Sequence, residues 1–185
     1  MKTRATTATD AAPVHYQVEL LDVHAHLFRV TLTVPNPAAQ QTLRLPVWIP
    51  GSYLVREFAK HLQKLDARQG SKRVPVQQQD KATWEVACTP GTALQVQYEV
   101  YAFDASVRTA WLDAQRGFFN GTSLCLQVPE LADTPHTLAI VAEGAPKGWQ
   151  VATGLDAVKC DKAGFGLYRA DNYDTLVDCP VELGP

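Results

Sequence analysis

Apolar and polar residues alternate along much of the chain, and this period of two constrains the fold more than any other feature of the sequence. The alternation holds over residues 16–20 and 28–34, on either side of a break at 22–26. Its apolar positions are Tyr16, Val18 and Leu20, and then Phe28, Val30, Leu32 and Val34. Successive side chains of a strand point to opposite faces of a sheet, so the pattern predicts strands with one buried face. The break fits a hairpin turn, although it lacks the Asn-Gly pair that marks the tightest turns.

Further runs with strand character follow, separated by turns rich in Pro, Gly and Asn. These runs are 43–48, 74–78, 83–87, 94–103, 107–112, 123–128, 137–141 and 166–170. Only residues 55–65 show helical spacing, which predicts a helical turn passing into a strand. The sequence therefore predicts an all-β fold, a mainly antiparallel β-sandwich of about ten strands with at most one or two short helices.

Charge and hydropathy exclude two classes of partner. The formal net charge is −2 and the pI is about 6.2, which leaves no basic surface for a row of phosphates, so we expect no nucleic acid. The apolar run at 43–49 is far shorter than the roughly 20 residues of a membrane helix, so we expect no membrane partner. Residues 1–13 lack the apolar centre of a secretory signal and are interpreted as a disordered tail of a cytoplasmic protein.

Metal-binding and catalytic motifs are missing from the sequence. The four cysteines, at 88, 125, 160 and 179, form no Cys-x-x-Cys pair and are predicted to be free thiols. His24-Ala25-His26 would place two rings on one face of a strand, but no third ligand accompanies them, so a solvated strand end is the better interpretation. We predict no catalytic residue, no metal ligand and no cofactor in this chain.

One segment, residues 48–61, has an unusual composition and is interpreted as a structural motif. Its predicted structural residues are Trp48, Pro50, Gly51, Ser52, Tyr53 and Arg56. We expect Trp48 to anchor a strand end in the core, Pro50-Gly51 to form a turn, and Ser52 to cap a short helix.

Three segments together carry a family resemblance. They are 48–61 (WIPGSYLVREFAKH), 107–121 with its VRTAWLD and GFFNG parts, and 173–182 (YDTLVDCPVE). In this order they resemble the N-terminal domain of glycyl aminopeptidases, family sixty-one of the metallopeptidases. The resemblance runs from about Tyr16 to the C-terminus.

The resemblance implies a β-sandwich that precedes a thermolysin-like zinc catalytic domain, followed in many relatives by a PDZ-like domain. The His-Glu-x-x-His helix of that family would lie beyond Pro185, so no catalytic or zinc residue is carried over and zinc is expected only in the parent enzyme. We interpret 14–172 as the sandwich domain and 173–185 as a linker towards the catalytic domain. The expected partners are that catalytic domain and, in the parent, a peptide substrate.

The segment from Asp104 to Gly121 mixes charged and aromatic residues, which suits a wall that faces a ligand. Its candidate residues for lining the substrate cleft are Asp104, Arg108, Asp113, Arg116 and Asn120. Asp113 is the first candidate acceptor for a substrate ammonium group, with Arg108 or Arg116 holding it in place. The alternatives are a surface loop with internal salt bridges, or a stand-alone module that binds a protein or carbohydrate through Trp111, Phe118 and Phe119.

Overall fold

A computed structural model describes residues 12–52 and 54–185, and within this part the chain is built almost entirely of strands. The large sheet has the order β13 (Asp156–Cys160), β14 (Gly166–Ala170), β11 (His136–Ile140), β1 (Val14–Asp22), β2 (Leu27–Val34), β8 (Leu94–Tyr101), β4 (Leu62–Gln69) and β5 (Lys72–Val74). A four-stranded sheet has the order β12 (Gln150–Thr153), β15 (Val181–Gly184), β10 (Gly117–Phe119) and β9 (Ala110–Leu112). A three-stranded sheet has the order β3 (Gln40–Arg44), β7 (Thr83–Ala87) and β6 (Val76–Gln78).

The predicted all-β class is confirmed, and the helices are short. They are α1 (Gly121–Leu124), α2 (Tyr173–Asp178) and the 3₁₀ turns η1 (Phe58–His61) and η2 (Pro129–Leu131). Paired strands are antiparallel except β1 and β11, which run parallel. The described residues contain fifteen strands instead of about ten. Strands β10, β12, β13 and β15 lie outside the predicted runs, because three to five residues are too few to show a clear period. The expected helical turn passing into a strand is confirmed by η1 and β4.

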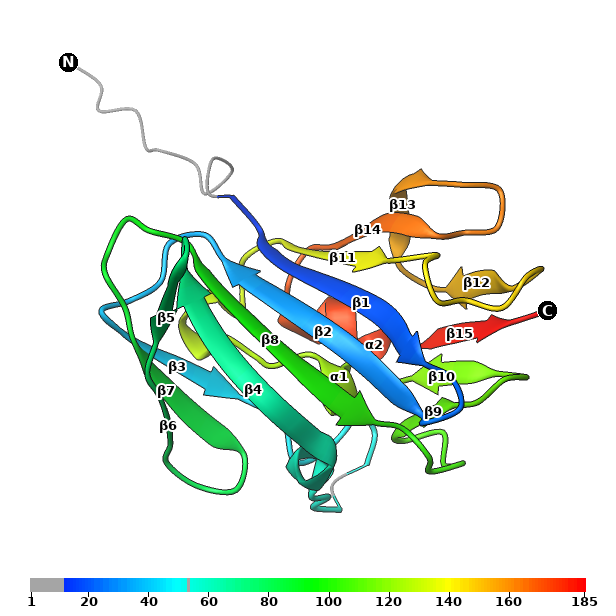
Figure 1. Cartoon of the computed structure of the whole chain (residues 1–185), viewed down its shortest axis with the longest axis horizontal. Coiled ribbons are helices and arrows are strands. Elements are labelled where there is room, and N and C mark those ends of the chain that lie inside the picture. Colours follow the sequence, from blue (N-terminus) through cyan, green and yellow to red (C-terminus); the bar gives the residue numbers. More distant parts are fainter. Residues whose placement is uncertain (1–11, 53) are drawn as a thin grey trace.

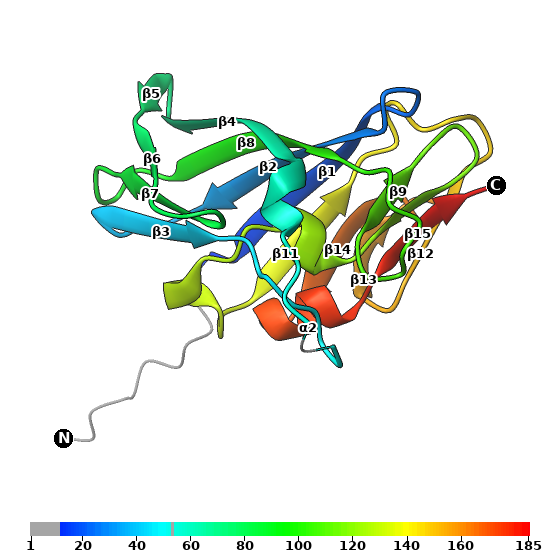
Figure 2. The ribbon, with the colours of Figure 1, turned by 90° about the horizontal axis from the view of Figure 1, so that it is seen from below.

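The sheets form two layers. The large sheet makes one layer, and the two small sheets lie at either end of its other face (Figures 1 and 2). Between the small sheets, that face is covered by η1, α1 and α2 (Figure 2). The core fills the space between the layers.

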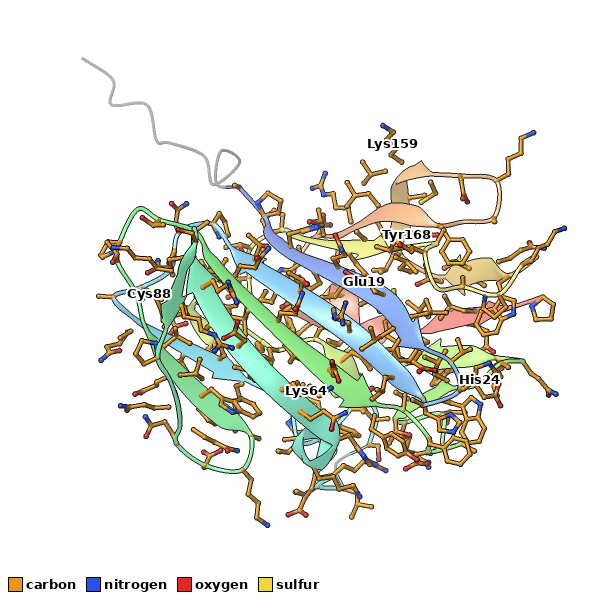
Figure 3. All side chains as sticks on the ribbon, in the orientation of Figure 1. Glu19, His24, Lys64, Cys88, Lys159 and Tyr168 are labelled. Atoms are coloured by element: carbon orange, nitrogen blue, oxygen red, sulfur yellow. The ribbon has the colours of Figure 1, made fainter. Side chains whose placement is uncertain are left out.

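The alternation seen in the sequence places one residue row across the inner face of the large sheet. Strand register aligns Tyr168, Leu138, Tyr16, Leu32, Val96 and Ala67 across six adjacent strands. All six side chains are buried, so the apolar face of each strand contributes to one shared core. The outer face is polar: Figure 3 shows Glu19 and Lys64 there, and each forms an ion pair across the sheet, with Arg29 and Glu99 respectively.

The predicted hairpin at 22–26 is confirmed, and it uses an aspartate in place of the Asn-Gly signal. Asp22 Oδ1 accepts the backbone N–H groups of His24 at 2.9 Å and Ala25 at 3.0 Å. His26 then takes a φ of +61°, a left-handed conformation that closes the turn into β2. The hydrogen bonds of the Asp22 carboxylate thus stabilise this turn, although it has no glycine at its left-handed position.

The strand predicted at 123–128 is wrong: residues 123 and 124 belong to α1, and residues 124–126 lie in the core without a sheet partner. Their carbonyls are satisfied by tyrosine hydroxyls instead. Tyr98, Tyr173 and Tyr16 donate to the carbonyls of residues 124, 125 and 126, at 2.6, 2.7 and 2.7 Å. Buried carbonyls need partners, and side chains from β8, α2 and β1 supply them here. We call this arrangement the tyrosine clamp.

Residues 173–185, which the sequence interpretation assigns to a linker, pack within the domain. They form α2 and β15, and Tyr173, Val181 and Leu183 are buried. β15 lies in the middle of the four-stranded sheet, paired with β10 and β12. The alternation of Val181 and Leu183 spans only four residues, too few to be read as a strand from the sequence. Of the expected tail at 1–13, residues 1–11 lie outside the described part of the chain.

Candidate functional site

The first part of the candidate cleft segment, residues 104–109, is a loop that bonds to itself. Asp104 Oδ1 accepts the backbone N–H of Ser106 at 3.0 Å, and the hydroxyl of Thr109 donates to the backbone carbonyl of Asp104 at 3.1 Å. The side chains of Asp104 and Arg108 are exposed, and neither forms an ion pair with another described residue. Two opposite charges therefore lie on a surface loop with their ionic groups open to a partner.

Asn120 has a structural position in this segment. Its side-chain Nδ2 donates to the carbonyl of Val107 at 2.7 Å, and its backbone N–H donates to the carbonyl of Thr109 at 3.0 Å. The residue is buried just before α1. It therefore ties the loop to the domain, and its amide is already used.

Asp113 begins the turn that joins β9 and β10. Its Oδ1 accepts the backbone N–H groups of Gln115 at 2.7 Å and Arg116 at 2.8 Å. Partial burial disfavours its charge, but these two N–H groups more than offset that effect, so the pKa of Asp113 is lowered. The carboxylate is thus ionised and fixed in direction by its own turn.

The guanidinium of Arg116 pairs with Glu182 of β15, a residue that the sequence interpretation did not select. Nε bonds one carboxylate oxygen and Nη2 bonds the other at 2.9 Å, while the guanidinium also lies 5.6 Å from the centre of the Phe118 ring. Among the described residues no side-chain hydrogen bond or ion pair joins Arg108 or Arg116 to Asp113; Arg116 reaches it through its backbone N–H. The alternation around Glu182 is too short to have shown from the sequence that this residue lies on a strand beside β10.

The aromatic residues of this segment are only partly accessible. Phe119 is buried in the core, whereas Trp111 and Phe118 are half-buried. The exposed rings come from β8 and from the residue soon after it, Tyr101 and Phe103. Phe103 stacks between Trp111, at 4.4 Å between ring centres, and His26, at 3.9 Å. We call Tyr101, Phe103, Trp111 and His26 the ring stack.

The 48–61 motif is structural in part. The Pro50-Gly51 turn is present, since Ser52 N–H donates to the carbonyl of Ile49 at 3.1 Å and Gly51 has a φ of +75°. The helix cap is wrong: the Ser52 hydroxyl instead accepts from Arg56 Nη1 at 3.1 Å, and η1 begins six residues later, at Phe58. Tyr53 lies outside the described residues.

The burial predicted for Trp48 is also wrong. The residue is 50% exposed. It lines a cavity together with Thr122 of α1 and Val177 of α2.

A cavity of about 210 Å³ lies where the three family-like segments meet. Trp48 and Pro50 come from the first segment, Thr122 lies next to the second, and Tyr173, Asp174 and Val177 come from the third; Arg44, Pro46, Val47 and Gln127 complete the wall. Figure 2 shows the chain before η1 beside α2, on the face opposite the large sheet. Segments far apart in the sequence thus build one concave site.

We next considered metal ligands and reactive thiols in the described part of the chain. Residues 12–52 and 54–185 contain no group of three His, Cys, Asp or Glu that could hold a metal ion. His24 lies at the exposed turn after β1, as labelled in Figure 3. All four cysteines are free, as predicted, and burial raises the pKa of Cys125 to about 12, which keeps it a thiol. No helix in the described ranges is long and apolar enough to cross a membrane.

Comparison with known proteins decides the family. The profile of the Peptidase M61 N-terminal domain matches residues 15–185. The chain belongs to this family. The M61 N-terminal domain matches the crystal structure of an aminopeptidase N family protein from Idiomarina loihiensis with 43% identity and a TM-score of 0.87, over 92% of this chain and 29% of that one. The chain therefore spans less than a third of that relative.

More distant structures share the fold of this M61 N-terminal domain. An M1 zinc metallopeptidase from Deinococcus radiodurans matches with 15% identity and a TM-score of 0.51, over 94% of this chain and 41% of that one. Aminopeptidase A from Legionella pneumophila matches with 8% identity and a TM-score of 0.52, over 93% of this chain and 21% of that one. A comparison with curated proteins finds no match.

Proposed function

We propose that this chain is the non-catalytic N-terminal domain of a zinc-dependent, glycyl aminopeptidase-like metallopeptidase. In this proposal it packs on the catalytic domain and helps to shape the peptide-substrate cleft. The observation that carries the proposal is the 43% identity to an aminopeptidase N family protein over 92% of this chain. Identity at that level over a whole domain supports a shared role as well as a shared fold.

Zinc and the catalytic groups belong to the other domain in this proposal. The described residues of this chain offer no three-ligand group, whereas activated water at a catalytic zinc needs about three fixed protein ligands. The ligands and the general base would therefore come from the catalytic domain. The N-terminal domain described here would contribute side chains that line the substrate cleft, including charged ones.

The surface that suits the cleft runs from the ring stack across the loop at 104–109 to the turn at 113–116. It combines exposed rings, the exposed charges of Asp104 and Arg108, and the ionised carboxylate of Asp113. An aminopeptidase must recognise a free ammonium group, for which a fixed carboxylate is a suitable acceptor. Asp113 meets this need because its turn, rather than a neighbouring arginine, holds it in direction.

The test is the kinetics of the full-length enzyme. Asp113→Asn should raise KM for aminoacyl substrates and lower kcat/KM about ten- to hundredfold, since a hydrogen bond to a charged group contributes about 1.5–3 kcal/mol. Arg116→Ala keeps the backbone N–H that holds Asp113, so it should change KM less. Zinc content should stay unchanged, and Tm should move little because the Arg116–Glu182 pair is exposed. Asp156→Asn, an exposed carboxylate on the edge strand β13, is the matched control. Unaltered kinetics in both variants would remove this surface from the cleft.

A further inference from the structure

The cavity between the 48–61 motif, α1 and α2 has the size of one amino-acid side chain. Its volume of about 210 Å³ is roughly seven times the share of one water molecule in the liquid. It lies below the roughly 300–1,000 Å³ of pockets that enclose a whole small-molecule ligand. A single ring-sized group is therefore the natural occupant.

Its walls are apolar and partly aromatic. Pro46, Val47, Pro50 and Val177 line it together with the half-exposed indole of Trp48. Apolar walls favour a group that leaves water, and an indole offers a flat face for offset or edge-to-face packing with another ring. These surfaces favour an aromatic ring over a charged head group.

The cavity wall includes one buried hydroxyl group, that of Thr122. Thr122 is 2% exposed, and its Oγ1 is buried without a hydrogen-bond partner among the described residues. A buried polar group left unpaired costs about 1–3 kcal/mol, so native structures leave few of them. Thr122 lines the cavity, and a ligand group that enters can provide the missing partner.

Three more polar side chains line the same cavity with their hydrogen-bonding capacity unused. No hydrogen bond or ion pair joins the side-chain groups of Arg44, Gln127 or Asp174 to another residue of 12–52 or 54–185. Arg44 and Asp174 balance each other in charge, so the site as a whole is neutral. It can both donate to and accept from a neutral hydroxyl.

We propose that this cavity binds a phenol-bearing side chain, as in a tyrosine residue of a peptide. The ring packs against Trp48 and the apolar walls, and the phenol hydroxyl bonds Thr122 Oγ1. The proposal does not depend on the proposed function, because it concerns a pocket formed by this chain alone.

The test is a titration of the ¹⁵N-labelled chain with blocked amino acids, followed by NMR chemical shifts. The probes are N-acetyl-L-tyrosinamide and N-acetyl-L-phenylalaninamide, whose blocked termini remove charge effects. We expect the tyrosine probe to bind with a Kd of about 1 mM, as its size allows, and to shift the Trp48 indole N–H and the Thr122 and Gln127 amide signals. The phenylalanine probe should bind about three- to tenfold more weakly because it lacks the hydroxyl.

Two variants separate ring packing from hydroxyl recognition. Thr122→Val keeps the shape and removes the hydroxyl, so the preference for the tyrosine probe should fall towards onefold while the phenylalanine probe binds as before. Trp48→Ala should weaken both probes about tenfold or more. Thr33→Val, on the outer face of β2, is the matched control and should change neither.

The proposal is overturned by any of three results. These are equal binding of the two probes to the wild-type chain, shifts confined to the ring stack, or a preference for tyrosine that survives Thr122→Val. Because valine also removes a buried unpaired hydroxyl, the Thr122→Val variant should fold, and its melting curve verifies this before the titration.

Discussion

The hydroxyl of Tyr173 in α2 donates a 2.7 Å hydrogen bond to the backbone carbonyl of Cys125. Both groups are buried, and 48 residues of sequence separate them. Tyr98 and Tyr16 donate to the carbonyls on either side, so the clamp joins α2, β8 and β1 through the end of α1 and the two residues after it. The clamp therefore holds the C-terminal end of α1, the helix that contains Thr122.

Tyr173→Phe should destabilise the domain by about 1–3 kcal/mol. The substitution keeps the ring but leaves the Cys125 carbonyl buried without its donor. Urea unfolding followed by fluorescence measures the change. Tyr101→Phe removes an exposed hydroxyl and is the control, expected within about 0.5 kcal/mol of wild type. Equal stability of Tyr173→Phe and wild type would show that water replaces the clamp.

Acid should destabilise the fold through His136. The ring is fully buried against Tyr16, and its Nδ1 donates to the Thr134 carbonyl at 2.7 Å, while its Nε2 has no partner among the described residues. Burial lowers the pKa of His136, and the bond to Thr134 only partly opposes this. The folded state therefore holds the neutral ring.

The sign of the pH dependence follows from this lowered pKa. The unfolded chain takes up a proton as pH falls through about 6.5, whereas the folded chain does so at a lower pH. The stability contributed by neutral His136 is complete above pH 6.5 and is lost as pH falls towards the folded pKa. Unfolding free energies between pH 7.5 and 5 should decline less in His136→Phe than in wild type. An identical decline would assign the effect to His15 and His61, whose pKa values burial also lowers.

Trp48 and Trp84 should respond differently to truncation. Trp84 is buried in β7, and Trp84→Ala should cost about 3–5 kcal/mol. Trp48 is half-exposed, so Trp48→Ala should cost about 1–2 kcal/mol, in proportion to its smaller buried area. Paired denaturation curves measure both, and equal losses would contradict the position of Trp48 at the cavity rim.

Two glycines with similar backbone angles should differ in their tolerance of alanine. Gly91 has a φ of +78° with open space around its Cα, so Gly91→Ala should cost about 1–2 kcal/mol for the conformation alone. Gly144 has a φ of +86°, and an added Cβ would collide with the backbone carbonyl of Leu20. Gly144→Ala should therefore lower Tm clearly further, and similar Tm values for the two variants would contradict this close approach.

The sequence predicted the parts of the fold where the period of two is long. Strands β1, β2 and β8 each have at least eight residues, and their alternation was sufficient to assign them. The strand predicted at 123–128 is wrong, because α1 ends at Leu124 and tyrosines distant in the sequence, rather than a neighbouring strand, satisfy the carbonyls of residues 124–126. The burial of Trp48 was mispredicted because a large apolar side chain is usually buried, whereas this one lines the cavity and is 50% exposed.

The sequence indicated which segment forms the candidate site, but it did not indicate how the side chains of that segment pair. The structure puts Asp113 and Arg116 in one turn, but the partner of the guanidinium is Glu182, which is 66 residues away. Thr122 carried no signal at all, because an unpaired hydroxyl is visible only once its surroundings are packed. Pairings of this kind depend on tertiary structure rather than on local spacing.

The most direct test of the proposed function is association between this domain and the proposed catalytic domain. Residues 1–185 and the separately produced remainder of the full-length protein would be mixed and their Kd measured by calorimetry. We expect specific one-to-one binding in the micromolar range or tighter, weakened at least tenfold by Phe103→Asp in the ring stack and unchanged by Thr33→Val, which lies at the other end of β2 from the ring stack. The absence of binding, or binding that Phe103→Asp leaves unchanged, would contradict the proposal that this surface packs beside the catalytic domain.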